Sequence, residues 1–91
     1  MTNTILDLFN ISNYGVITFN TTHQALRSEN ILKDSGANFL LIPTPRQISA
    51  SCGMAVKFVW IDRDLIIKTL RENDVQWQSI HHISKENEND R

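Results

Sequence analysis

The stretch that decides the fold is residues 14–42, which read Y-G-V-I-T-F-N-T-T-H-Q-A-L-R-S-E-N-I-L-K-D-S-G-A-N-F-L-L-I. Its first seven residues are rich in β-branched and aromatic side chains, a composition typical of a β-strand. A helix is expected over residues 21–35, because Thr21 has the form of a capping residue and Gly36 is placed to end the helix. Residues 37–42 are again apolar and predict a second strand. The stretch therefore predicts a β-α-β unit.

The rest of the chain predicts a second half of the same kind. Residues 55–60 alternate as a strand does, and a helix over residues 62–73 follows, with Asp62 as its expected cap. Residues 75–83 form the predicted last strand. The order is therefore β-α-β-β-α-β, and right-handed crossovers place both helices on one face of a four-stranded antiparallel sheet. We predict the α+β class and a ferredoxin-like two-layer sandwich.

Each predicted helix carries an apolar stripe that we expect to face the sheet. The first stripe consists of Ala25, Leu26 and Leu32. The second stripe consists of Leu65, Ile66, Thr69 and Leu70. The opposite face of the sheet is then uncovered, and Val16 and Thr18 are among its residues. An uncovered and partly apolar face favours a homodimer or another protein partner.

The predicted domain spans residues 14–83 and has a short extension on either side. Residues 1–13 contain an apolar cluster followed by turn-forming residues, which predicts a docked helical turn or a flexible arm. Residues 84–91 are almost wholly polar, so we expect this tail to fray.

Composition and charge narrow the classes of function. The chain has 91 residues, with nine Lys and Arg against ten Asp and Glu. This balance argues against a nucleic-acid binder, which usually carries a basic excess. No apolar run is long enough to cross a membrane, and the N-terminus lacks the pattern of a secretory signal, so we expect a cytoplasmic protein. The single cysteine, Cys52, allows no intrachain disulfide and leaves too few ligands for a structural zinc site.

The loop between the second and third predicted strands contains the residues most suited to chemistry. Residues 43–53 read P-T-P-R-Q-I-S-A-S-C-G, which is longer than a hairpin connection needs. Two prolines stiffen its beginning, so we expect the rest of the loop to hold a defined direction. Gly53 allows positive φ or a close backbone approach directly after Cys52.

Several neighbours are expected to support Cys52 as a sulfur anion. Hydroxyl and backbone N–H groups donate hydrogen bonds to such an anion, and arginine supplies positive charge, so these surroundings favour a thiolate. The candidate supporting residues are Arg46, Ser49, Ser51, Gly53 and His23, the last in the first turn of the helix. A reactive Cys52 should be exposed at the tip of the loop. The alternative is that Cys52 is a small buried hydrophobic residue and His23 an ordinary surface residue.

Two motifs resemble those of a known family. T-H-Q-A-L from Thr22, with Glu29, and P-T-P-R-Q-I-S-A-S-C-G from Pro43 are similar to the motifs T-H-x-A-L-x-x-E and P-x-P-R-x-I-S-x-x-C-G of the selenium/sulfur carrier-like family, also called DUF3343. The resemblance implies that Cys52 accepts sulfur or selenium as a persulfide or selenopersulfide and passes it to an acceptor protein. Arg46 and loop N–H groups would stabilise the anion. Such a carrier needs no metal or other cofactor, but it depends on donor and acceptor proteins.

Two other functions stay open. A carrier turns over only with its partners, so we expect a carrier or binding protein rather than a stand-alone enzyme. A small binding module would use a pocket beside the loop and leave Cys52 without a role. A structural dimer would form through the uncovered sheet face, and a charge at Val16 would disrupt it.

Overall fold

Four strands and two α-helices follow one another in the order β-α-β-β-α-β along residues 13–84, the part of the chain that the computed structural model describes. The elements are β1 (Asn13–Thr18), α2 (Thr22–Leu32), β2 (Phe39–Pro43), β3 (Met54–Val59), the 3-10 helix η1 (Trp60–Asp62), α3 (Arg63–Glu72) and β4 (Ser79–Ser84). The predicted α+β class, with a four-stranded antiparallel sheet and two helices, is confirmed. The arm predicted over residues 1–13 and the tail predicted over residues 84–91 lie outside the described part, except for Asn13 and Ser84, which belong to β1 and β4.

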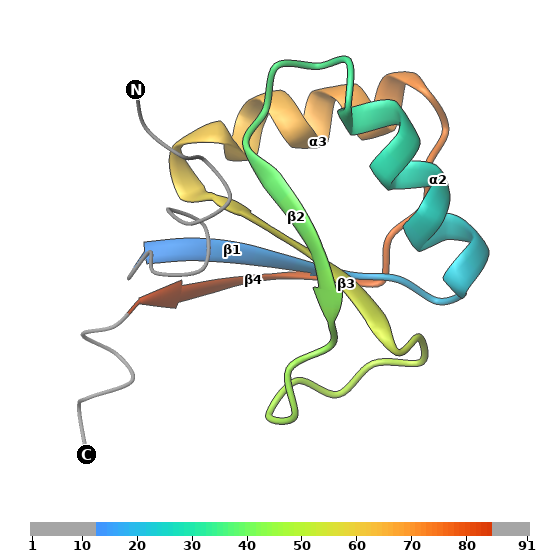
Figure 1. Cartoon of the computed structure of the whole chain (residues 1–91), viewed down its shortest axis with the longest axis vertical. Helices are drawn as coiled ribbons and strands as arrows, with labels where there is room; N and C mark the ends of the chain where they lie inside the picture. Colours follow the sequence, from blue (N-terminus) through green and yellow to red (C-terminus); the bar gives the residue numbers. More distant parts are fainter. Residues whose placement is uncertain (1–12, 85–91) are drawn as a thin grey trace.

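The strand order in the sheet is β2-β3-β1-β4, and every neighbouring pair is antiparallel. Figure 1 shows α2 and α3 on the same side of this sheet. Because β1 lies between β3 and β4, both of its edges are hydrogen-bonded. No helix between residues 13 and 84 combines the length and the apolar character that crossing a membrane requires.

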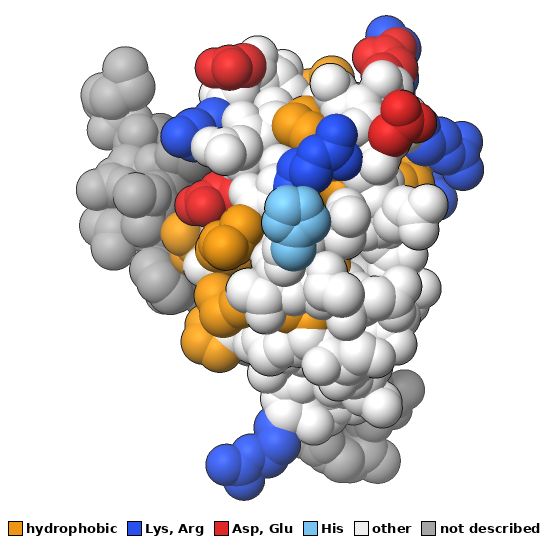
Figure 2. All heavy atoms as spheres, turned by 90° about the vertical axis from the view of Figure 1, so that its right-hand side faces the viewer, with side chains coloured by type: hydrophobic (Ala, Val, Ile, Leu, Met, Phe, Trp, Pro, Cys, Tyr) orange, Lys and Arg blue, Asp and Glu red, His pale blue; other side chains and the backbone are white. Residues whose placement is uncertain are grey.

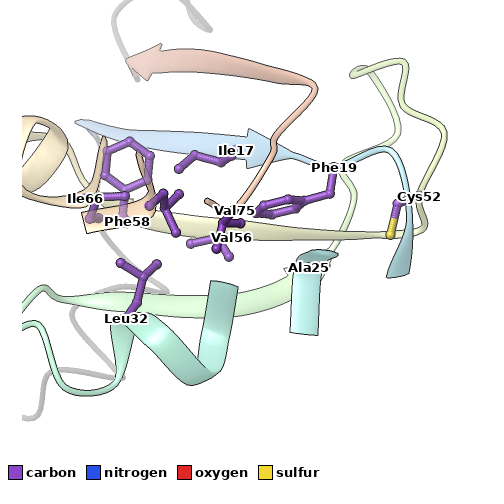
Figure 3. Packing of buried hydrophobic residues seen from close by; sticks show 10 residues of the cluster. Ile17, Phe19, Ala25, Leu32, Cys52, Val56, Phe58, Ile66 and Val75 are labelled. Atoms are coloured by element: carbon purple, nitrogen blue, oxygen red, sulfur yellow. The ribbon is translucent and has the colours of Figure 1, made fainter. Parts of the chain in front are cut away.

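Buried apolar side chains form two clusters, one on each face of the sheet. The main cluster lies between the sheet and the helices and consists of Ile17, Phe19, Ala25, Leu32, Cys52, Val56, Phe58, Ile66, Leu70 and Val75. Figure 3 shows these side chains converging between α2 and the strands. The smaller cluster, on the other face, consists of Val16, Ala55 and the loop residue Ile48. The prediction of an uncovered face is therefore wrong at its centre, because Val16, Thr18 and Ala55 are fully buried and Ile48 packs there.

Gly15 is required by the packing of the sheet. It pairs with Phe58 across β1 and β3, and a Cβ atom at position 15 would lie 2.1 Å from the Cζ atom of the Phe58 ring. The ring therefore occupies the space that a side chain would need. Phe58 also stacks on Trp60, with ring centroids 5.9 Å apart. A glycine in the centre of a strand is thus explained by an aromatic ring that covers it.

The start of α2 follows the prediction, and its end comes earlier. The Thr21 hydroxyl accepts a hydrogen bond from the backbone N–H of Gln24 at 3.2 Å, as a capping residue does. The Gln24 side chain bonds elsewhere, because its Oε1 accepts from the N–H of Gln76 at 3.2 Å. The helix ends at Leu32, and Gly36 follows with a φ of 86°.

The buried faces of both helices are rotated relative to the predicted stripes. In α2, Ser28 is buried and Leu26 is 49% exposed. The Ser28 hydroxyl donates to the carbonyl of Ala25 at 2.7 Å, so its burial leaves no unpaired polar group. In α3, Ile67 is buried and Leu65 is 40% exposed.

Asp62 does not cap α3 with its side chain. Its Oδ2 accepts a hydrogen bond from the backbone N–H of Asn38 at 3.0 Å, which fixes the chain as it enters β2. Asp62 therefore stands at the predicted N-cap position of α3, but its carboxylate makes no cap hydrogen bond because it has a partner on another element.

The last strand is shorter than predicted. Residues 75–78 form a connection, and β4 begins at Ser79. The N–H of Gln76 donates to the side chain of Gln24, and the N–H of Gln78 donates to the carbonyl of Thr18 at 2.7 Å. This connection is thereby tied to both α2 and the end of β1.

Candidate functional site

The loop of residues 44–53 joins β2 to β3 and inserts one side chain into each cluster. Ile48 packs against Val16 and Ala55 on the face away from the helices. Cys52 belongs to the main cluster, between the sheet and the helices. The loop is therefore anchored on both faces of the sheet, by Ile48 on one face and by Cys52 on the other, and these two contacts fix its position.

Thr44 closes the base of this loop. Its backbone N–H donates to the carbonyl of Gly53 at 2.9 Å, and its hydroxyl donates to the carbonyl of Cys52 at 3.0 Å. A turn further along the loop is closed by the N–H of Ile48, which donates to the carbonyl of Pro45 at 3.0 Å. The side-chain and backbone hydrogen bonds of Thr44 thus fix the position of Cys52.

The sulfur of Cys52 contacts two polar groups. The backbone N–H of Met54 donates to Sγ at 3.3 Å, and the hydroxyl of Thr22 lies 3.6 Å from Sγ. Figure 3 shows the sulfur at the edge of the cluster, beside the chain that leads into α2. Thr22 is the first residue of α2, and the N-terminus of a helix carries a partial positive charge that favours an anion. A thiolate at this position has two donors and a favourable helix end.

The expectation of an exposed thiol at the loop tip is wrong. Cys52 is 5% exposed, although Ser51 and Gly53 on either side of it are exposed. Cys52 stands two residues before Met54, the start of β3, and side chains two apart in a strand point to the same face. The side chain of Cys52 therefore continues the row of β3 side chains that face the helices.

None of the predicted supporting residues, all of which the structure describes, makes a hydrogen bond to the sulfur of Cys52. The side chains of Arg46, Ser49 and Ser51 are exposed, and among residues 13–84 no hydrogen bond or ion pair joins any of them to Sγ. Ser51 contributes its backbone instead, because its N–H donates to Oε1 of Gln78 at 3.1 Å. His23 is exposed and follows Thr22, so it lies at the same end of the sheet as the loop.

Neither reason expected for a glycine at position 53 applies. Gly53 does not have a positive φ, and a Cβ atom there would meet nothing within 4 Å. The glycine leaves the surface beside Cys52 without a side chain.

Sequence reasoning assigned no role to Thr22, Met54 or Gln78. Of the three, Thr22 is the one for which the sequence contains a signal, because it precedes His23 in a motif that was expected to lie near the loop. The N–H of Met54 is a backbone group, which no side-chain pattern reveals. Gln78 lay inside a predicted strand, where its side chain had no expected partner.

The surface around the site is largely uncharged. Figure 2 views the molecule from the side where α2 begins, and charged side chains gather in the upper part of this view. Its lower half is mostly white, the colour of the backbone and of side chains that are neither hydrophobic nor charged, with one basic side chain at the bottom. In the loop and the chain entering α2, the exposed charged residue is Arg46, and the exposed uncharged residues are Asn20, Thr21, Thr22, Gln47, Ser49, Ser51 and Gly53. A negative charge on Cys52 would therefore face neutral polar groups rather than carboxylates.

The two adjacent histidines have partners of their own. The Nε2 atom of His81 lies 2.9 Å from the hydroxyl of Ser79, and the ring of His82 stacks on Trp60 with centroids 3.9 Å apart. Within the described range, no three His, Cys, Asp or Glu side chains are grouped as metal ligands.

Comparison with known proteins identifies the family. The family described as "Putative Se/S carrier protein-like" matches residues 14–82. The chain belongs to this family. It is also 36% identical over 62 residues to the uncharacterized protein MJ0011 of Methanocaldococcus jannaschii, a match that covers 68% of this chain and 31% of that protein. The chain thus spans less than a third of the length of this relative. No solved structure matches the chain.

The Se/S carrier-like match includes the whole candidate site. It begins in β1 and ends in β4, so it contains Thr22, the loop with Cys52, and Gln78. The family resemblance predicted from the two motifs is therefore confirmed. The same motifs meet in space, because Thr22 from the first contacts Cys52 from the second.

Proposed function

We propose that Cys52 carries sulfur or selenium as a persulfide or selenopersulfide and passes it to an acceptor protein. The observation that carries the proposal is the position of the sulfur, in contact with the Thr22 hydroxyl and the Met54 N–H at the start of α2. Membership of the Se/S carrier-like family supports the same function.

Loading of the carrier requires no oxidant. The Cys52 thiolate attacks the terminal sulfur of a donor persulfide, a new bond forms between Sγ and that sulfur, and the donor's S–S bond breaks. The donor leaves as a thiolate and takes up a proton from water. The thiolate is the reactive form of cysteine, so the Met54 N–H and the Thr22 hydroxyl assist by stabilising it before attack.

Delivery reverses these roles. A nucleophile of the acceptor protein attacks the terminal sulfur or selenium, and Cys52 leaves as a thiolate that the same two donors stabilise. The protein returns to its starting state without a metal or another cofactor. Donor and acceptor proteins complete the cycle, so the chain acts as a carrier rather than as an enzyme on its own.

The proposal extends to the fold type and the cellular setting. The strand order β2-β3-β1-β4 with both helices on one side supports a ferredoxin-like two-layer sandwich. A single unpaired cysteine that works as a thiolate suits a reducing compartment, which supports the cytoplasm.

Mass spectrometry of the intact protein tests the proposal. The folded protein is incubated with inorganic polysulfide, freed of reagent and weighed, and a parallel sample is treated with selenide and glutathione disulfide. We expect a gain of a single sulfur or selenium atom, removed by a thiol reductant, in the wild type and no gain in Cys52→Ser. A wild-type protein that stays unloaded while Cys52 still reacts with iodoacetamide would contradict the proposal.

A non-catalytic binding or dimerisation module is the second candidate, and the burial of Cys52 in the main cluster favours it. In this module Cys52→Ala would fold and keep its partner. A homodimer through the sheet face of Val16 belongs to the same candidate. Because Val16 is fully buried, a charge there would test folding rather than association, so sedimentation of the wild type is the better measurement.

A further inference from the structure

The burial of Cys52 conflicts with the work of a carrier. A thiol that receives and delivers an atom must meet the reacting groups of two other proteins, yet Cys52 is 5% exposed. Ser51 and Gly53 beside it are exposed, so the buried thiol lies one residue from the surface on either side along the chain. Local opening of a short segment costs less free energy than unfolding of the domain.

The two ends of the loop are held with different strength. At its base, Thr44 makes two hydrogen bonds, to the carbonyls of Cys52 and Gly53. In its middle, Ile48 is buried in the smaller cluster. Between Ile48 and Cys52 the tie to the rest of the protein is a single exposed hydrogen bond, from the N–H of Ser51 to Oε1 of Gln78. This bond is exposed and is made by the residue that precedes Cys52.

Gln78 is itself held in place. Its backbone N–H donates to the carbonyl of Thr18 at 2.7 Å, at the end of β1. Two residues earlier, the N–H of Gln76 donates to Oε1 of Gln24, in the first turn of α2. The connection of residues 75–78 is thus fixed to the same helix end that contacts the sulfur, and the Gln78 side chain joins it to the loop.

We infer that Gln78 is a positioning residue that holds Ser51, and with it Cys52, in the buried position, and that release of its bond to Ser51 presents the thiol to donor and acceptor proteins. Opening breaks the Ser51–Gln78 bond, the two contacts of Sγ and the bond from the Thr44 hydroxyl to the Cys52 carbonyl. The bond from the Thr44 N–H to Gly53 and the buried Ile48 hold the rest of the loop. The biological role of this opening rests on the proposed carrier function. The opening itself can be measured without any sulfur transfer.

The rate at which iodoacetamide alkylates Cys52 in the folded protein measures this opening. Gln78→Ala removes the acceptor, and we expect alkylation about three- to tenfold faster than in the wild type, as the loss of one exposed hydrogen bond allows. Gln78→Glu keeps an oxygen acceptor at the same reach, so its rate should stay at or below that of the wild type. Gln76→Ala is the matched control, because only the backbone of Gln76 makes a hydrogen bond, and its rate should stay within about twofold.

The urea midpoint of each variant separates opening from general loss of stability. A positioning role predicts that Gln78→Ala and Gln76→Ala have similar midpoints and different alkylation rates. Wild-type rates in Gln78→Ala, equal acceleration in Gln78→Glu, or rates that simply follow the midpoints would overturn the inference. Sulfur loading of the wild type tests the carrier proposal separately. Whether or not the wild type takes up sulfur, the alkylation rates of the Gln78 variants still decide whether Gln78 holds Cys52 in place.

Discussion

The two helices begin in opposite electrostatic surroundings. The first turn of α2 contains no acidic residue, its cap is the hydroxyl of Thr21, and Sγ of Cys52 lies beside Thr22. At the start of α3, Asp64 lies in the first turn and pairs with Arg63 at 3.0 Å. Carboxylates satisfy the positive end of a helix and repel a further anion. The first half of the fold therefore leaves its helix end available for a sulfur anion, and the second half does not.

A carboxylate in the first turn of α2, like the one in α3, should have the largest effect on the reactivity of Cys52. Thr22→Asp places a carboxylate beside Sγ, so we expect alkylation of Cys52 to slow by about tenfold or more, since two like charges at this distance interact strongly near a protein surface. The urea midpoint should stay equal or rise, because an acidic residue stabilises the first turn of a helix. A variant that loses stability and reactivity together would show only that Thr22 is needed for folding.

Removing the cap of α2 should be the next largest effect. Thr21→Ala loses the hydroxyl that accepts from Gln24, and we expect a loss of about 1 kcal/mol in the free energy of unfolding. Asp64→Ala is the comparison in α3, where the exposed carboxylate makes no cap bond and the loss should be within about 0.5 kcal/mol. Equal losses in urea denaturation would remove the difference between the two helix starts.

The hydroxyl of Thr22 should have a smaller effect on the thiol. Thr22→Val keeps the shape of the side chain and removes the donor, so alkylation should slow by about threefold. Thr22→Ser keeps the hydroxyl and should react at close to the wild-type rate. If serine and valine give the same rate, the helix end rather than the hydroxyl acts on the sulfur.

A substitution at Gly53, the residue after Cys52, should have the smallest effect, here on the free energy of unfolding. Gly53→Ala adds a Cβ atom in open space, at a position without positive φ, so the free energy of unfolding should change by less than about 0.5 kcal/mol. Gly15→Ala is the contrast, because the added atom meets the Phe58 ring and should cost about 1–3 kcal/mol. Thermal unfolding of the two variants checks both values.

The order of elements was predictable because apolar periodicity and turn residues carry it. The rotation of each helix about its axis was not predictable in the same way. In α2, Leu26 is more apolar than Ser28, yet Ser28 is the buried residue, because its hydroxyl is hydrogen-bonded to the carbonyl of Ala25. The start of the last strand was also missed, because β4 begins at Ser79 rather than at residue 75. The N–H of Gln76 bonds to a side chain of α2, and such a partner leaves no periodic trace in the sequence.

The candidate site was predicted in its centre and missed in its surroundings. The motif around Cys52 identified the residue and the family. The burial of Cys52 was within reach of the sequence, because Cys52 shares the parity of Val56 and Phe58 in the third strand. The contact with Thr22 was not, since it joins residues 30 positions apart that meet only through the pairing of the strands.

The central claim is that Cys52 holds a transferable atom at the start of α2, and cyanolysis tests it most directly. Cyanide removes the terminal sulfur of a persulfide as thiocyanate, so the loaded and desalted protein reports its own cargo. We predict about one thiocyanate per chain from the wild type, markedly less from Thr22→Asp, and none from Cys52→Ser, in line with a reaction at the thiolate. Thiocyanate released equally by wild type and Cys52→Ser, or by neither, would contradict a carrier role for Cys52.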